Sequence, residues 1–62
     1  MTIRELFRVA VNGDTKAERR NAFRQLREIA ARGNGQEATE AREALQDSAR
    51  YAQKIKEEND GQ

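Results

Sequence analysis

Apolar residues recur at helical spacing in three stretches of the chain, and glycines separate these stretches. The first two stretches follow the i, i+3, i+4, i+7 pattern that marks one face of a helix. Their apolar members are Ile3, Leu6, Phe7 and Ala10, then Ala22, Phe23, Leu26, Ile29 and Ala30. The chain contains no proline and is rich in alanine, arginine and glutamate, so helix is the preferred structure nearly throughout. The pattern predicts an all-α fold.

Each predicted helix opens with residues that can form a capping box, in which a polar side chain accepts from the backbone N–H three residues on. The pairs are Thr2 with Glu5, Thr15 with Glu18, and Asn34 with Glu37. Gly13 and Gly33 stand where a helix that ends in a left-handed residue favours glycine. These signals predict helices at residues 3–12, 16–32 and 35–57, followed by a frayed polar tail at 58–62.

The segment "RGNG" at residues 32–35 combines a helix stop with a helix start. A phosphate-binding loop needs a preceding strand and, in its commonest form, a Gly-Lys-Ser/Thr ending. Neither feature is present, so we interpret this segment as a bend between two helices.

The third predicted helix has small apolar residues at alternating spacings of three and four, the seven-residue rhythm of a helix that packs along another helix. Its seam positions are Ala38, Ala41, Leu45, Ser48, Ala52 and Ile55. Small residues permit close approach, so we expect the helices at 16–32 and 35–57 to form a long antiparallel hairpin. The first helix would cover the overhanging end, placing Ile3, Leu6 and Phe7 over Tyr51, Ala52 and Ile55. A second copy of the chain could supply the same cover by dimerisation.

The 62 residues are enough for one small domain, which we place at residues 1–57. The chain has few large apolar residues, so its core should be small. Because there is no Cys or His, neither a disulfide nor a conventional zinc site can stabilise that core. No apolar run approaches the roughly 20 residues that cross a bilayer, and the charges inside "MTIRELFRVAV" do not suit a signal peptide. The absence of cysteine fits a reducing compartment, and we expect a cytoplasmic protein.

Charge is divided unevenly between the two halves of the chain, although the formal net charge is only +1. Residues 1–32 carry eight basic against four acidic residues, and residues 33–62 carry four basic against seven acidic. At 100° per residue, four cations of the second helix fall within an arc of about 80°. They are Lys16, Arg20, Arg24 and Arg27. This basic face could contact a protein partner, contact the phosphates of a nucleic acid, or simply be solvated.

Other polar residues suggest weaker hypotheses. Glu40, Glu43 and Asp47 share one face of the third helix and form a candidate acidic partner face. Tyr51 flanks this face, and we expect its ring to be half buried as part of the core, with its hydroxyl at water. If exposed, it would be a candidate aromatic anchor for a partner. Arg19 points toward the apolar side of the second helix, where we expect it to lie over Ala49 and to reach an acid near the end of the chain.

The chemistry of catalysis is poorly represented in this sequence. Without His or Cys, the commonest general base and the thiolate nucleophile are missing. The run "AFRQLREIAARGNGQEATEAREAL" resembles in a general way one helix pair of a HEAT or armadillo-type repeat, but a single pair cannot form a solenoid and no family is assigned. We therefore expect a non-enzymatic interaction module, an adaptor, regulator or inhibitor, without a cofactor or metal. The alternative is an accessory nucleic-acid-binding protein that uses the basic face.

Overall fold

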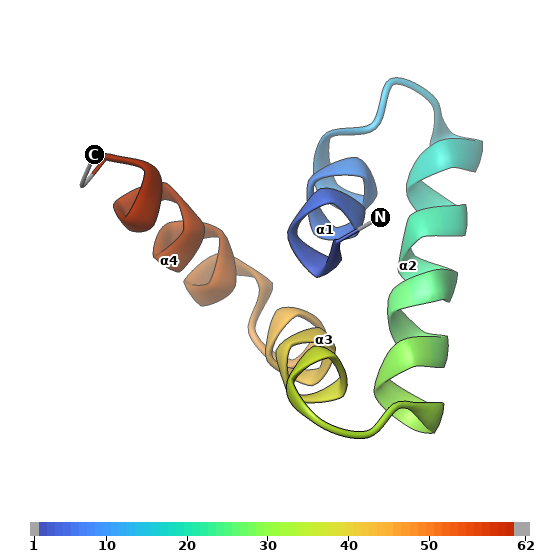
Figure 1. The fold of residues 1–62 in the computed structure, drawn as a ribbon. Coiled ribbons are helices and arrows are strands. Elements are labelled where there is room, and N and C mark those ends of the chain that lie inside the picture. Colours follow the sequence, from blue (N-terminus) through green and yellow to red (C-terminus); the bar gives the residue numbers. More distant parts are fainter. Residues whose placement is uncertain (1, 61–62) are drawn as a thin grey trace.

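The computed structural model describes residues 2–60, with side chains up to Glu58. Within this range the fold is all-α, and four helices follow one another without a strand (Figure 1). They are α1 (Ile3–Asn12), α2 (Lys16–Arg32), α3 (Gln36–Gln46) and α4 (Ser48–Asp60). α1 lies between α2 and the start of α4, and α4 leads away from the other three helices (Figure 1).

The starts of α1 and α2 are fixed by side-chain caps, as the sequence predicts. The Oγ1 atom of Thr2 accepts from the backbone N–H of Glu5 at 3.2 Å. Thr15 does the same for the N–H of Glu18 at 3.1 Å. Each cap satisfies one of the N–H groups that a helix start leaves without a partner. The bounds of both helices agree with the predicted residues 3–12 and 16–32.

The predicted role of Gly13 and Gly33 as left-handed helix stops is wrong. Their φ angles are −56° and −76°, which any residue can adopt. Both instead pass so close to the preceding turn that a Cβ atom would lie 2.6 Å from the carbonyl oxygen of Val9 or Ile29. The one glycine with positive φ among the described residues is Gly35, at +85°. It also caps α3 without any side-chain hydrogen bond, so the predicted Asn34 cap is wrong.

The predicted single helix at 35–57 is also wrong, because the chain breaks at Asp47. This residue has φ −144° and ψ 83°, outside the helical region. Its N–H donates to the Glu43 carbonyl at 3.1 Å, and its carbonyl accepts from Tyr51 N at 3.0 Å. The Asp47 side chain accepts from Arg50 N at 3.2 Å, as an N-cap does. Asp47 therefore ends α3 and starts α4 with no loop between them, and the predicted long hairpin stops at Gln46.

The bend brings Tyr51 onto α1. In a straight helix, Tyr51 would lie about 80° round from the mean direction of the buried alanines of α3, taking 100° per residue. In the bent chain it is buried, and its ring meets Phe7 edge to face, with centroids 4.8 Å apart and planes at 74°. The prediction that α1 covers Tyr51 is confirmed. The same bend leaves Ser48 and Ala52 exposed, contrary to the predicted seam.

The core is small and draws on all four helices. Leu26 is fully buried at its centre. The other members of the buried cluster are Ile3, Leu6, Phe7, Ala10, Ala22, Ala41, Ala44 and Tyr51. Phe23, Leu45 and Ile55 pack against this cluster while keeping part of their surface exposed. Three of its members are alanines of α2 and α3, which allows these two helices to approach closely.

Two arginines have structural roles. Arg19 is predicted to reach an acid near the end of the chain, but among the side chains described, up to Glu58, it pairs with none. Its Nη1 instead donates to the Gly13 carbonyl at 2.6 Å and thereby holds the α1–α2 turn. Arg42 Nε donates to the Ala30 carbonyl at 3.0 Å and ties α3 to the last turn of α2. α4 continues to Asp60, three residues beyond its predicted end. The rest of the predicted tail, Gly61 and Gln62, lies outside the described residues, as does Met1.

Candidate functional site

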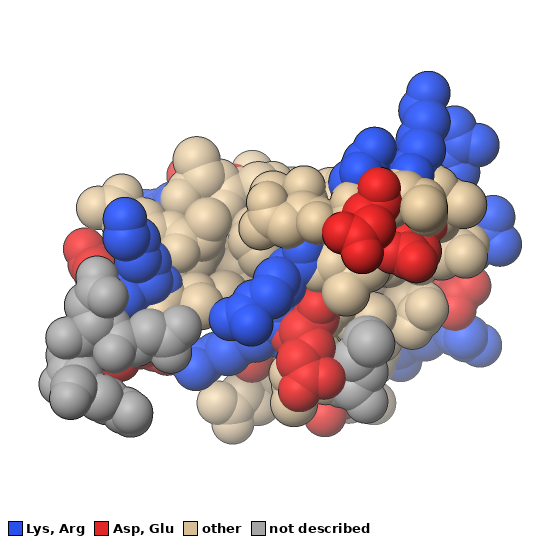
Figure 2. Space-filling model, turned by 90° about the horizontal axis from the view of Figure 1, so that it is seen from above, with Lys and Arg blue, Asp and Glu red and all other residues tan. Residues whose placement is uncertain are grey.

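The basic face of α2 lies on the outside of the molecule, as the sequence predicts. All four of its cations, Lys16, Arg20, Arg24 and Arg27, are exposed, while Ala22 and Leu26 on the inner side of the same helix are buried. Thr15 fixes where the helix begins and so sets the direction of every side chain after it. Figure 2 shows Lys and Arg gathered at the right of the molecule, the side on which α2 lies.

An open groove of about 570 Å³ runs along this face. Its lining comprises Lys16, Arg19, Arg20, Phe23, Arg24 and Arg27. The structure therefore gathers all four predicted cations in one groove and adds two half-buried residues, Arg19 and Phe23. Phe23 provides an apolar contact beside five positive charges. Helical projection could have found Phe23, since it falls only about 20° from Lys16 round the helix.

The cations of the basic face have no acidic partners within the part of the chain that the structure describes. The ion pair on α2 there joins Arg32 to Glu28 at 3.6 Å, at the far end of the helix. Successive basic residues stand three or four positions apart, a spacing at which like charges destabilise a helix by about 0.2–0.5 kcal/mol per pair. Three such pairs, 16/20, 20/24 and 24/27, make the basic face unfavourable for stability by about 1 kcal/mol.

The acidic residues proposed as a partner face have partners within the chain. Glu40 accepts from the Tyr51 hydroxyl at 2.9 Å and lies 3.6 Å from Arg4 Nε. Glu43 pairs with Lys54 at 3.5 Å across the bend. Asp47 caps α4. That these acids meet another molecule stays a prediction; within the chain they hold the bend between α3 and α4.

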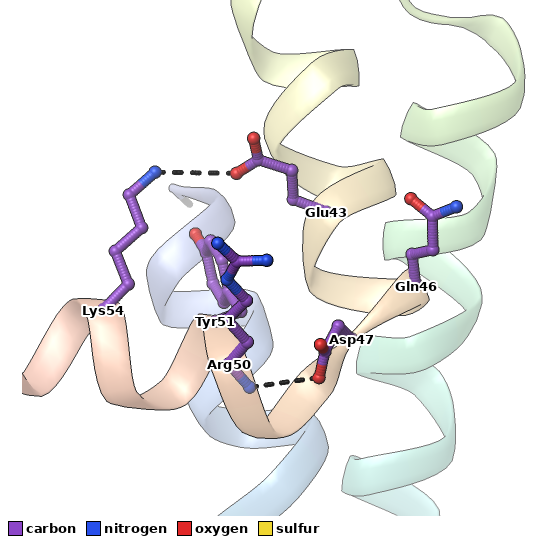
Figure 3. A pocket seen from close by; sticks show the side chains of 6 residues that line it. All are labelled: Glu43, Gln46, Asp47, Arg50, Tyr51 and Lys54. Carbon is purple, nitrogen blue, oxygen red and sulfur yellow. Dashed lines mark hydrogen bonds and ion pairs between the residues drawn. The ribbon is translucent and has the colours of Figure 1, made fainter.

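A second groove, of about 640 Å³, follows the inside of this bend (Figure 3). Two acids, two bases, Gln46 and Tyr51 line it, so its charges balance. The Glu43–Lys54 ion pair spans one side, and Asp47 accepts from the Arg50 backbone at its base (Figure 3). With balanced charges and internal pairing, this groove has no evident preference for a charged ligand. It is mainly a feature of how α4 attaches.

Tyr51 occupies the wall of the second groove but is not a free anchor. Only 3% of its surface is exposed, and its hydroxyl donates to Glu40 rather than to water, contrary to the prediction. Burial raises the pKa of the Tyr51 hydroxyl above its ordinary value of 10.0, and the hydrogen bond and negative charge of Glu40 raise it further. The hydroxyl therefore remains a hydrogen-bond donor at all ordinary pH values.

Arg4 makes tertiary contacts that the sequence does not reveal. Its guanidinium forms ion pairs with Glu40 of α3 and with Glu58 of α4. One side chain of α1 thus connects the two helices on either side of the bend. Since Glu40 and Glu58 are far from Arg4 in sequence, no local spacing could have indicated this contact.

No group of three or more residues that could hold a metal ion is found in the described part of the chain. None of the helices described is long and apolar enough to cross a membrane. Comparison with known proteins finds no family model that matches the chain, and no curated protein and no solved structure with significant similarity. The groove along α2 is the candidate site on the basis of its geometry and charge.

Proposed function

We propose that this chain is a non-enzymatic interaction module that binds an acidic surface of a protein partner through the basic face of α2. The observation that supports this is the difference in pairing between the two charged faces. The three residues of the candidate acidic face, Glu40, Glu43 and Asp47, are occupied by Arg4, Lys54 and the start of α4. The four cations of the basic face have no such partners among the described residues, although their mutual repulsion opposes helix formation.

The dimensions of the basic face suit an acidic helix. Residues 16 and 27 are separated by a rise of about 16 Å, and residues four apart by about 6 Å. An acidic helix with carboxylates at i and i+4 repeats at the same spacing. Arginine forms two parallel hydrogen bonds to a carboxylate, and Phe23 adds an apolar contact at the edge of the groove. We therefore expect a protein partner that carries an acidic helix on its surface. This chain would act on that partner as an adaptor, a regulator or an inhibitor.

Charge reversal tests this proposal. The double variant Arg20→Glu with Arg24→Glu should lose the partner that the wild-type chain captures from native lysate. A control with the same change in net charge is Arg8→Glu with Lys56→Glu, at exposed positions away from the groove. The control should retain the partner. Capture that is equal for both double variants would contradict a role for α2.

The alternative function is binding to a nucleic-acid backbone through the same cations. The arginine-rich groove favours it, because Arg binds phosphate as it binds carboxylate. Against it stands the net charge of +1. Of the three aromatic residues, Phe7 and Tyr51 are buried and cannot stack on bases, which leaves only the half-buried Phe23 at the groove. Nuclease treatment of the lysate separates the two readings: a protein partner survives it. Direct binding to an oligonucleotide that is absent at about 50 mM salt, or is unchanged by Ala at Arg20 and Arg24, would rule the alternative out.

Three further expectations belong to the same proposal. The chain would have no catalytic activity, in keeping with its lack of His and Cys. It would act in the cytoplasm. It would also self-associate, because its core is thin for a chain without disulfide or metal. Sedimentation at several concentrations tests this last expectation: a single monomeric mass up to high micromolar concentration would end it.

A further inference from the structure

The junction between α3 and α4 differs from the other two junctions of the fold. α1 and α2 are joined through Gly13, and α2 and α3 through Gly33 and Gly35. The α3–α4 junction is the single residue Asp47, and residues 36–60 contain neither glycine nor proline. Strong helix formers stand on both sides of it. The sequence of this segment is therefore compatible with one continuous helix.

The bend costs few backbone hydrogen bonds. Helical bonding continues up to the N–H of Asp47 and resumes with the N–H of Tyr51. A continuous helix would add bonds from residues 48, 49 and 50 to the carbonyls of 44, 45 and 46, and these bonds are absent from the described structure. The Asp47 carboxylate replaces one of them, by accepting from Arg50 N. Straightening would exchange this cap for the missing helical bonds.

Four contacts keep the segment bent, and each one joins α4 to another part of the chain. They are the Tyr51–Phe7 ring contact, the Tyr51–Glu40 hydrogen bond, the Arg4–Glu58 ion pair and the Glu43–Lys54 ion pair. Two of these contacts are made to α1, through Phe7 and Arg4. They can be formed by an α4 from the same chain or from another chain. A second copy of the chain carries an identical α4.

The exposed side of α4 carries the unused half of the helical seam. Ala38, Ala41 and Leu45 of the seven-residue repeat pack inward, whereas Ser48 and Ala52 are exposed and Ile55 is half buried. In a straight helix all six would form one continuous stripe. The repeat therefore fits a helix partnered along its whole length, which the bent monomer does not provide.

We infer that this chain forms a domain-swapped dimer, in which α3 and α4 join into one helix and α4 of each copy packs against α1 of the other. The surface of α1 that bears Phe7 and Arg4 is the docking site, and its occupant is α4 of a second copy. The swap recreates the same aromatic contact and ion pair between chains, as domain swapping does. It gives the proposed self-association a defined geometry and is independent of what α2 binds.

Two substitutions at the junction shift the equilibrium in opposite directions. Asp47→Ala removes the cap of the bent form and favours a continuous helix. A cap of typical strength corresponds to about a fivefold change per chain, so the association constant of a dimer should rise roughly 25-fold. Ser48→Pro does the reverse, because proline suits the first position of α4 and cannot continue α3. Proline also favours extended backbone at the residue before it, which Asp47 nearly has.

Sedimentation velocity over a wide range of concentration compares the wild type with both variants. The expected result is a monomer–dimer equilibrium that Asp47→Ala shifts toward dimer and Ser48→Pro shifts toward monomer. If Asp47→Ala proves unfolded, the comparison of wild type with Ser48→Pro still decides. Equal association of these two chains, or no association of the wild type up to about 1 mM, overturns the inference.

Crosslinking distinguishes a swap from a dimer of bent chains. The chain has no native cysteine, so Arg4→Cys in one copy and Glu58→Cys in another introduce a single thiol each. In a swapped dimer these positions meet between chains, and the mixed disulfide should form far faster than a control pair with Arg8→Cys. Equal rates would overturn the swap. Ser48→Pro should retain capture of the α2 partner, so failure of the swap and failure of the proposed binding function are separable.

Discussion

At Gly35 the backbone has φ +85° and ψ −155°, a combination that side chains of L-amino acids rarely adopt. No atom lies within 4 Å of a Cβ placed there, so backbone conformation alone requires glycine. We predict that Gly35→Ala lowers the free energy of unfolding by about 1–3 kcal/mol. D-alanine at the same position should retain or raise stability, because the mirror-image conformation is ordinary extended backbone for an L-residue. Thermal unfolding of the two synthetic chains tests this.

Gly33 provides the contrasting control. Its φ of −76° and ψ of 156° are ordinary for any residue, but a Cβ would lie 2.6 Å from the Ile29 carbonyl and 3.1 Å from the Ala38 side chain. L-alanine should therefore destabilise through steric contact. D-alanine should not relieve the loss, since the backbone there suits an L-residue. A D-alanine rescue at Gly33, or its failure at Gly35, would contradict the two assigned causes.

Tyr51 combines burial with a single polar contact, and its pKa has a consequence for stability. In the unfolded chain the hydroxyl ionises near pH 10.0, whereas in the folded chain burial and Glu40 hold it protonated to higher pH. Its contribution to stability is therefore complete below pH 10 and is lost as the pH rises toward the folded-state pKa. Above pH 10 the loss should approach about 1.4 kcal/mol per pH unit. Urea unfolding between pH 8 and 11.5 measures it.

Tyr51→Phe isolates this effect from the titration of lysine. At neutral pH the variant should lose about 1 kcal/mol, the net value of one hydrogen bond, because Glu40 still has Arg4 beside it. Its stability should fall less steeply above pH 10 than that of the wild type. Parallel slopes for the two chains would show that the hydroxyl ionises as freely in the folded state as in the unfolded state.

At the scale of the helices, the features that sequence predicts well are those with local causes. The starts of α1 and α2 depend on Thr2 and Thr15, whose caps act within three residues. The break at Asp47 combines a local cap, from the Asp47 side chain to Arg50 N, with a tertiary contact, the burial of Tyr51 against Phe7. No glycine or proline marks it. The periodicity across residues 38–55 indicated one helix, because an apolar pattern shows which side of a helix is buried and contains no information on contacts with other helices.

The candidate site divides in the same way. Helical projection placed the four cations of the basic face on one exposed side of α2, because their positions depend on α2 alone. It could not place Arg19, which turns back to the Gly13 carbonyl, or show that Glu40 and Glu43 are neutralised. Those contacts join different helices. Sequence thus predicted where charge would lie and could not predict which charges would be paired.

The cations of the basic face should lower the stability of α2 by mutual repulsion while providing the binding surface. In the wild type, Arg20 forms like-charge pairs with Lys16 and Arg24, each four residues away. Arg20→Glu turns both into opposite-charge pairs. Each change of sign is worth about 0.5–1 kcal/mol, so the variant should unfold at higher urea concentration while losing its partner. Arg20→Gln should give about half the gain, and 1 M salt should reduce both. A variant less stable than the wild type would contradict repulsion within the basic face.

At the scale of the whole molecule, the thin core limits every other feature. A chain of 62 residues at 0.05–0.15 kcal/mol per residue has a free energy of unfolding of about 3–9 kcal/mol. Leu26 alone, fully buried, would cost about 2–5 kcal/mol if truncated to alanine. Stability must therefore be concentrated where α1, α2 and α3 meet. α4 joins this core through Tyr51 and the partly buried Ile55.

This uneven distribution predicts that α4 separates from the molecule before the rest unfolds. Its amides should exchange with solvent through a local opening and be at least about tenfold less protected than the central amides of α2. Arg4→Ala should lower the protection of α4 further, because Arg4 pairs with Glu58, and should change α2 little. Arg8→Ala is the matched control on the same helix, at an exposed position. Native-state hydrogen exchange followed by NMR measures all four helices at once. Equal protection in α2 and α4 would mean that the molecule opens only as a whole, and the bend at Asp47 would then be as firmly held as the core.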